Sequence, residues 1–169
     1  LSEGGIRVPL ILRWPAMLPA GREFSMPISA MDLTATIATA AGVKPAPSKL
    51  FDGVDLVRAL KGKLDLDYDR PLFFRRRKVS VREGLNAIRQ SAVRKGDWKY
   101  LRTYRPVGSG KYQAALYNLK RDNSEKKNVA AAYPEVVKGM SDLLGQWEHE
   151  MSKTAEPFPE VLTRKKTRK

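Results

Sequence analysis

The sequence predicts an α+β protein: a four-stranded antiparallel sheet packed by one long C-terminal helix, preceded by a strand and a helix from a large α/β domain. Three observations support this fold class. Short apolar runs separated by turn residues follow one another between residues 70 and 119. A single apolar stripe with helical spacing continues from Val136 to Met151. An almost uninterrupted apolar run, Ile6 to Trp14, opens the chain.

The opening run predicts a strand that ends at Pro15. A strand this apolar is typical of the middle of a sheet, yet no residues before it could form the neighbouring strands. We therefore interpret the chain as the tail of a larger protein. Deprived of its sheet, such a strand also favours self-association through Val8 to Leu12.

Two helices are predicted after this strand. Either Asp32 or Ser29 caps the first helix, whose apolar residues recur at helical spacing. This helix ends at Gly42, a residue suited to the left-handed conformation that closes many helices. A short second helix is expected from Val54 to Leu60.

The second half of the chain predicts a sheet and a covering helix. Consecutive strands with short links favour an antiparallel meander, and Lys95-Gly96-Asp97 forms one of its turns. The strands are expected at Leu72–Phe74, Asn86–Arg94, Trp98–Tyr104 and Ala114–Leu119, and the helix begins near Tyr133. Residues 1–65 are accordingly predicted to end the large domain, 66–155 to form the sheet and helix subdomain, and 156–169 to be a disordered basic tail.

Composition limits the possible functions. The chain has 169 residues, a formal net charge of +14 and no cysteine. The lack of cysteine excludes a disulfide framework, a thiolate nucleophile and a thiolate metal site. The charge predicts attraction to nucleic acid, an anionic membrane or a sulfated polysaccharide, although an ordinary soluble basic surface is the simpler explanation. No run is long and apolar enough to span a bilayer.

The residues suggest no complete catalytic or metal site. His149, the only histidine, is predicted to be a solvated residue of the last helix. Asp32 is expected to act as a helix cap, and Glu3 to pair with Arg7 or Arg13. Neither carboxylate has a partner at a spacing that acid–base catalysis would require.

The best candidates for direct anion contact are Arg75, Arg77 and Arg82. Along a strand, Arg75 and Arg77 project to one face and Arg76 to the other. Guanidinium groups bind sulfate or phosphate through paired hydrogen bonds. The alternative is that these charges only protect an edge strand from aggregation.

Five segments match, in order and spacing, the motifs of one enzyme family. They are Glu3–Pro9 with Trp14-Pro15, Asp32–Ile37 with Ala41-Gly42, Asp52–Leu56 followed by Leu60 and Gly62, Ala92–Tyr100, and Leu116–Leu119. Together they resemble the C-terminal third of a type I (formylglycine-dependent) sulfatase, arylsulfatase-like, of the alkaline phosphatase superfamily. Two positions depart from that pattern: Ala35 stands where proline is common, and Asn118 replaces the usual aspartate.

The resemblance implies a parent enzyme that hydrolyses sulfate esters, of a sulfated carbohydrate or an aryl sulfate, with a formylglycine nucleophile and a bound calcium ion. Both belong to motifs upstream of Glu3, so no catalytic residue, metal ligand or cofactor is expected in this chain. The implied partners are the N-terminal sulfatase domain and a sulfated small molecule or polysaccharide, with Arg75, Arg77 and Arg82 as contacts at the rim of the substrate pocket. Bacterial members are commonly exported, which favours a location outside the cytoplasm.

By itself the chain is therefore expected to be catalytically inactive. The alternative function is a non-catalytic basic module that binds sulfated polysaccharide or nucleic acid. Against nucleic acid, the aromatic residues Trp98, Tyr100 and Tyr104 also suit an ordinary sheet core, and no nucleic-acid motif is present.

Overall fold

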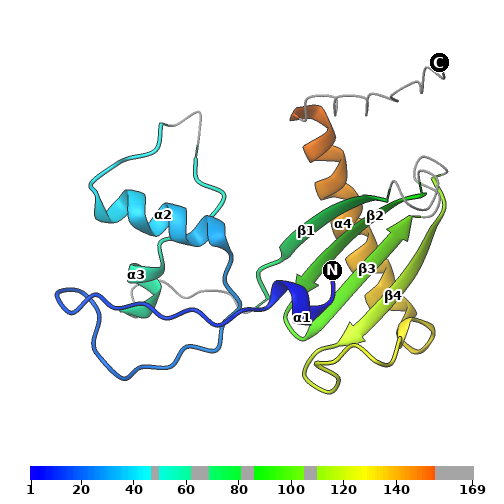
Figure 1. The fold of residues 1–169 in the computed structure, drawn as a ribbon, viewed down its shortest axis with the longest axis horizontal. Helices are drawn as coiled ribbons and strands as arrows, with labels where there is room; N and C mark the ends of the chain where they lie inside the picture. The colour runs from blue at the N-terminus through cyan, green and yellow to red at the C-terminus, as the bar shows by residue number, and fades with distance from the viewer. Residues whose placement is uncertain (47–49, 62–68, 81–85, 105–109, 155–169) are drawn as a thin grey trace, which may run out of the picture.

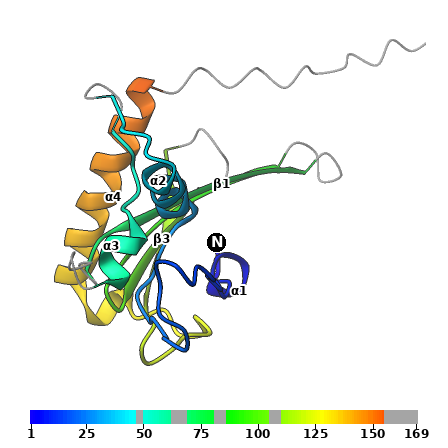
Figure 2. The same cartoon turned by 90° about the vertical axis from the view of Figure 1, so that its left-hand side faces the viewer.

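The computed structural model describes residues 1–46, 50–61, 69–80, 86–104 and 110–154, with backbone alone for 77–80, 86–88 and 154. Figures 1 and 2 show helix α4 on one face of a twisted sheet and the short helix α1 against the other face. The elements, in chain order, are α1 (Glu3–Ile6), α2 (Ala30–Ala40), α3 (Leu56–Leu60), β1 (Leu72–Ser80), β2 (Asn86–Lys95), β3 (Trp98–Tyr104), β4 (Tyr112–Asn118), the 3-10 turn η1 (Ala130–Ala132) and α4 (Pro134–Thr154).

The sheet is the predicted antiparallel meander, with the strand order β1-β2-β3-β4. The tight turn at Gly96, whose φ is +55°, pairs Lys95 with Trp98 and sets the register of β2 against β3. Outward from this turn, Val93 lies opposite Tyr100, and Tyr100 lies opposite Leu116. Because opposite residues share a face, these three side chains form one row across the sheet.

That row meets α4 in the main hydrophobic core. Val93, Tyr100 and Leu116 pack with Met140 and Leu144 of the helix, and all five are buried. Phe73 of β1 extends the contact by stacking on Trp147 of α4, with ring centroids 5.0 Å apart and planes 3° apart. Pro134 opens the helix, where a missing backbone N–H carries no penalty. The predicted sheet and covering helix are thus confirmed.

The strand expected from Ile6 to Trp14 is not formed. Residues 3–6 make α1 instead, and the backbone that follows belongs to no sheet ladder in the described chain. Val8 and Ile11 are 77% and 91% exposed. A strand exists only through hydrogen bonds to a neighbour, and no described strand runs beside these residues. Residues 6–14 therefore have the apolar composition of a strand, but no described strand pairs with them.

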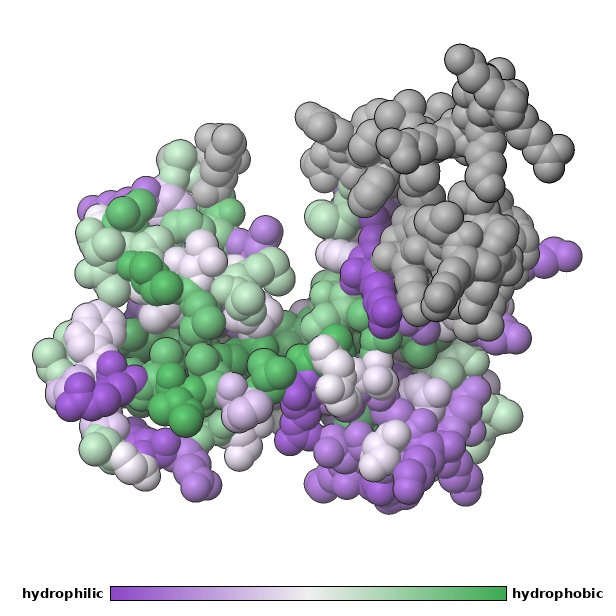
Figure 3. Space-filling view, viewed as in Figure 1, coloured by the Kyte–Doolittle hydropathy of each residue, from purple (hydrophilic) through white to green (hydrophobic). Residues whose placement is uncertain are grey.

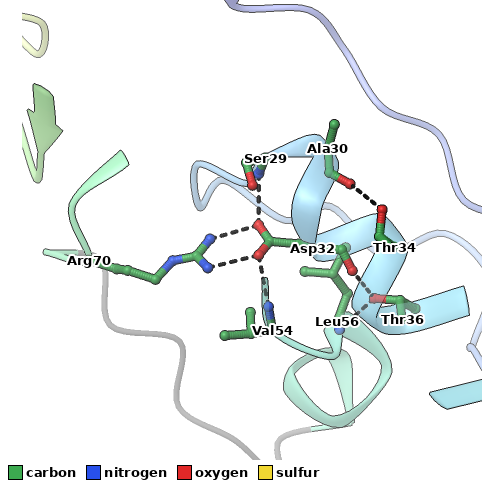
Figure 4. A network of polar contacts seen from close by, with 8 residues as sticks. All are labelled: Ser29, Ala30, Asp32, Thr34, Thr36, Val54, Leu56 and Arg70. Atoms are coloured by element: carbon green, nitrogen blue, oxygen red, sulfur yellow. Dashed lines mark hydrogen bonds and ion pairs between the residues drawn. The ribbon is translucent and has the colours of Figure 1, made fainter. Parts of the chain in front are cut away.

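Asp32 joins the helical N-terminal half to the residues that lead into β1 (Figure 4). Its carboxylate accepts backbone N–H groups of Ser29 at 2.7 Å and of Val54 at 2.9 Å. Arg70 donates two further hydrogen bonds to it, at 2.8 and 2.7 Å. The N-cap of α2 is Ser29, with Asp32 in the first turn, so the carboxylate caps the helix and also binds beyond it.

Gly53 explains the glycine of the aspartate-glycine-valine motif. A Cβ atom at this position would overlap the carbonyl group of Met31 and the amide nitrogen of Asp32. The loop therefore passes against the first turn of α2 only because residue 53 has no side chain. This approach brings the N–H of Val54 to the Asp32 carboxylate.

Candidate functional site

Arg75 lies on the face of the sheet that α4 covers. Its guanidinium carbon is 5.2 Å from the ring centroid of Trp147, and the residue is exposed. Arg76 is also exposed and occupies the next strand position, so it belongs to the opposite face. Arg77 is paired in register with Arg89, with only its backbone described. Arg82, the third predicted contact, lies outside the described residues.

The structure adds cationic and aromatic residues that sequence reasoning missed. Arg89, Tyr104 and Tyr112 lie at directly opposite positions on β2, β3 and β4. The guanidinium carbon of Arg89 is 3.9 Å from the ring centroid of Tyr104. The rings of Tyr104 and Tyr112 follow at 5.4 Å, tilted by 57°. We call these three residues the basic–aromatic row.

A single carboxylate, that of Glu148, anchors α4 beside this row. It accepts hydrogen bonds from Ser91 at 2.7 Å, Arg102 at 2.9 Å and Tyr104 at 3.2 Å. Arg102 also donates to the carbonyl and hydroxyl oxygens of Ser141, at 2.6 and 2.7 Å. Burial alone would lower the pKa of Arg102, but Tyr100 and Tyr104 outweigh it, so the pKa lies above its ordinary value. Arg102 is therefore a permanent positive charge under the helix.

The opposite face of the sheet holds a buried ionic cluster around α1. The Lys99 ammonium, fully buried, lies 3.0 Å from Glu3 and 2.8 Å from Glu125. Arg94 approaches the other Glu3 oxygen at 3.4 Å, and the backbone N–H of Glu3 donates to the Glu125 carboxylate. The expected pairing of Glu3 with Arg7 or Arg13 is wrong, because Glu3 turns to the sheet. Arg7 instead donates to Asn123 at 2.7 Å.

None of these groups forms a reactive centre. His149 is exposed on α4, as predicted. Among the described residues, no group of histidines and carboxylates could hold a metal ion. The carboxylates of Asp32, Glu3 and Glu148 are already bound by arginine or lysine. In the described ranges the arrangement can bind anions and hold the fold together. The serine hydroxyl that meets a carboxylate, Ser91 on Glu148, is fully buried and so cannot reach a substrate.

The basic–aromatic row was predictable once the turn at Gly96 had been placed. Counting outward from the Lys95–Trp98 pair puts Arg89 opposite Tyr104. The connection between β3 and β4 gives no such fixed starting point, so Tyr112 could not be aligned in this way.

No helix in the described part of the chain is long and apolar enough to cross a membrane.

Comparison with protein families gives a match over residues 1–150 to the model described as "N-sulphoglucosamine sulphohydrolase, C-terminal". An N-acetylgalactosamine-6-O-sulfatase of Bacteroides thetaiotaomicron is 33% identical over 153 residues, which cover 84% of this chain and 27% of that protein. Human steryl-sulfatase is 48% identical over 61 residues, covering 36% of this chain and 10% of its own length.

Solved structures show the same relationship. The crystal structure of Ps i-CgsB superimposes with a TM-score of 0.60 at 28% identity, covering 79% of this chain and 27% of the other. A second structure, titled as BT4656 in complex with its substrate D-glucosamine-2-N,6-O-disulfate, gives a TM-score of 0.63 at 22% identity, covering 86% and 28%, and supports the fold alone.

The chain thus spans about a quarter of the length of the curated relatives that it matches over most of its residues, 27% and 25% for the first two. The family match, the sequence relatives and the shared fold all agree. The chain belongs to the sulfatase family, whose C-terminal part it matches over residues 1–150.

Proposed function

We propose that this chain completes an enzyme that hydrolyses sulfate esters of carbohydrates, and that it contributes fold and substrate contacts rather than the reacting groups. The match of residues 1–150 to a sulfatase C-terminal region carries the proposal. It is supported by the sheet and helix, which pair as in the structural neighbours.

The cofactors of the family do not fit the residues described here. Calcium takes six to eight oxygen ligands, mostly carboxylates and carbonyls. The buried carboxylates Asp32 and Glu3 are each bound by cations of the chain, Arg70 and Lys99. The chain has no cysteine, and none of its serines stands in the short motif with proline and arginine from which the family makes formylglycine. We therefore assign calcium and formylglycine to the parent enzyme.

The proposed substrate is a sulfated carbohydrate. Relatives named as N-acetylgalactosamine-6-sulfatases support this class, as does the Ps i-CgsB structure titled as a complex with k-i-k-neocarrahexaose. Arg75, Arg77 and Arg82 are the proposed contacts at the rim of the substrate pocket. Arg75 fits the role because it is exposed and its described contact is a ring rather than a carboxylate.

The proposal extends to domain organisation. Residues 1–65 would end the large domain, residues 66–155 would form the C-terminal subdomain, and the basic tail 156–169 lies outside the described residues. The partner of the chain would be the N-terminal sulfatase domain. Export, favoured by the resemblance to bacterial sulfatases, belongs to the same proposal.

The test compares the 169-residue chain with the same chain joined to the polypeptide encoded upstream of it. Each is incubated with a sulfated glycosaminoglycan oligosaccharide, and released sulfate is measured by ion chromatography. We expect release by the longer protein after its nucleophile has been converted to formylglycine, and none by the chain alone. Sulfate release by the purified chain above a buffer blank would overturn the assignment of the chemistry to upstream residues.

A non-catalytic binding module is the second candidate, favoured by the net charge of +14. It would bind a polyanion without any upstream domain that turns over sulfate esters. The same experiment separates the two candidates, since an upstream polypeptide that confers no sulfate release leaves only binding.

A further inference from the structure

The basic–aromatic row lies where the helix-covered face of the sheet reaches its far end. Arg89 and Tyr104 are a directly opposite pair, and Tyr112 continues the row onto β4. Arg75 of β1 flanks the row on the same face. Both arginines meet the C-terminal half of α4: Arg75 lies over Trp147, and Arg89 approaches the Glu148 carboxylate. Two exposed or half-exposed guanidinium groups therefore border one strip of surface.

Among the described residues, this strip carries more positive charge than negative charge. Glu148 is the carboxylate that faces the strip, and its oxygens already accept bonds from Ser91, Arg102 and Tyr104. Arg89 is 3.9 Å from it, which is beyond hydrogen-bond distance. The Nε atom of Arg89 is buried without a hydrogen-bond partner. Its guanidinium is thus positioned on Tyr104, and because the side chain is 37% exposed, its terminal nitrogens, unlike the buried Nε, can donate to a ligand.

We propose that Arg75, Arg89 and Tyr112 form a binding strip for the sulfate groups and sugar rings of a polymeric sulfated carbohydrate. The guanidinium groups would each bind a sulfate through paired hydrogen bonds. Tyr112, 44% exposed, offers a ring face on which a sugar can pack. The choice of ligand rests on the proposed function, and the strip extends it by assigning residues outside the Arg75–Arg82 run.

The geometry favours a sulfated sugar over single-stranded nucleic acid. Nucleic-acid platforms stack successive bases on several open aromatic rings. Here Tyr104 is only 7% exposed, and Arg89 lies on its ring. Tyr112 is then the more open ring of the row: Arg102 lies 4.9 Å from its centroid, and Arg89 lies two strands away. A surface with two guanidinium groups and one open ring suits a sugar that carries several sulfate groups. It suits a run of stacked bases less well.

The test measures binding by isothermal titration calorimetry, using the full 169-residue chain. The probes are a chondroitin sulfate hexasaccharide, its chemically desulfated form and a single-stranded DNA of equal net charge. Loss of one charge-assisted contact in Arg89→Gln should weaken binding of the sulfated probe about tenfold. Arg89→Lys should retain an intermediate affinity, and Tyr112→Ala should weaken it severalfold. Thermal unfolding of every variant reports whether the fold is intact.

Lys138→Gln is the matched control, because it removes one positive charge from an exposed side chain near the other end of α4. It should bind like the unmodified chain. Equal affinity of the Arg89→Gln and Lys138→Gln variants would overturn the strip, as would equal binding of the desulfated probe or tighter binding of the DNA. Binding by the strip in a protein whose longer form releases no sulfate would contradict the proposed function and leave the strip standing.

Discussion

At the scale of single residues, Asp32 determines how the N-terminal half is organised. Its two carboxylate oxygens accept four hydrogen bonds, from two backbone N–H groups and from both terminal nitrogens of Arg70. Burial by itself would raise the pKa of Asp32, but the bonds from Arg70, Ser29 and Val54 outweigh it and hold the pKa below its ordinary value. A fully buried carboxylate is thus kept ionised because every lone pair is used.

We predict that Asp32→Asn destabilises the protein by about 3 kcal/mol or more near neutral pH, since it leaves Arg70 without a charged partner. The lowered pKa means that the ion pair stabilises the native state above the ordinary carboxyl pKa and is lost as the pH falls through the folded value. The difference between the two proteins should therefore shrink below about pH 4. Urea unfolding at several pH values measures both effects, and a difference that does not change with pH would contradict the role of the charge.

Only part of the arrangement around Asp32 could be predicted from the sequence. The position of Asp32 before an apolar helix predicted a cap, and the structure confirms a carboxylate in the first turn of α2. Its pairing with Arg70, 38 residues away, depends on how the chain returns to the sheet. Nothing in local spacing specifies that return. Long-range ion pairs such as this one are set by tertiary structure, and the same reason explains why the partner of Glu3 was mistaken.

At the scale of elements, α1 is held on the sheet by charge rather than by apolar contact. Lys99 is completely buried and binds two carboxylates far apart in the sequence, Glu3 near the start and Glu125 in the loop after β4. Glu125 has a φ of +55°, an unfavourable conformation for a residue with a Cβ atom. Its use of a side-chain oxygen for the Glu3 N–H helps to offset that cost. The cluster fastens the start of the chain to the third strand.

Replacing Glu3 with Gln should loosen this attachment, because Lys99 loses one of its two charged partners inside the protein. We expect a loss of about 2 kcal/mol in the free energy of unfolding and faster amide hydrogen exchange in residues 1–13. Hydrogen exchange followed by mass spectrometry provides the measurement. Glu23→Gln, which changes an exposed carboxylate on the same half of the chain, is the control. Unchanged exchange in Glu3→Gln would show that the cluster does not hold α1.

The sequence predicted some helices and strands with their observed limits and others only in part. The strand Trp98–Tyr104 was expected with its observed limits, because the glycine turn defines one end and the alternation defines the rest. The first sheet strand was expected to end at Phe74 but continues to Ser80, since its run of arginines pairs with β2 despite its charge. The strand expected from Ile6 to Trp14 has the right composition but no ladder. Sequence pattern specifies which face a strand buries, whereas the ladder depends on the neighbours available.

At the scale of the whole molecule, the two halves differ in how much apolar surface they expose. Figure 3 shows hydrophobic residues gathered over the half that contains α2, and more hydrophilic residues over the lower part of the sheet half. The exposed apolar side chains of the N-terminal half are Val8, Leu10, Ile11, Leu12, Met17, Phe24, Met31, Ile37, Val43 and Leu50. A surface of this kind is typical of an interface.

The chain by itself should self-associate through residues 8–12, where extended backbone and exposed apolar side chains coincide. We predict that Leu10→Lys shifts the sedimentation coefficient toward that of a monomer, because a charge in the contact opposes pairing. Leu50→Lys places the same charge at another exposed apolar site and should have a smaller effect. Two variants that sediment like the unmodified chain would exclude this segment as the contact.

The closure of Lys99 on Glu3 and Glu125 also has a consequence for synthesis on the ribosome. Glu3 emerges 96 residues before Lys99 and 122 residues before Glu125. The β2–β3 hairpin, whose partners are close in sequence, can form as soon as it leaves the exit tunnel. The first residues must wait until Glu125 is translated, so α1 and the exposed apolar segment next to it are not held on the sheet during that interval. A nascent chain of this protein is therefore a natural client for chaperones that bind apolar segments near the tunnel.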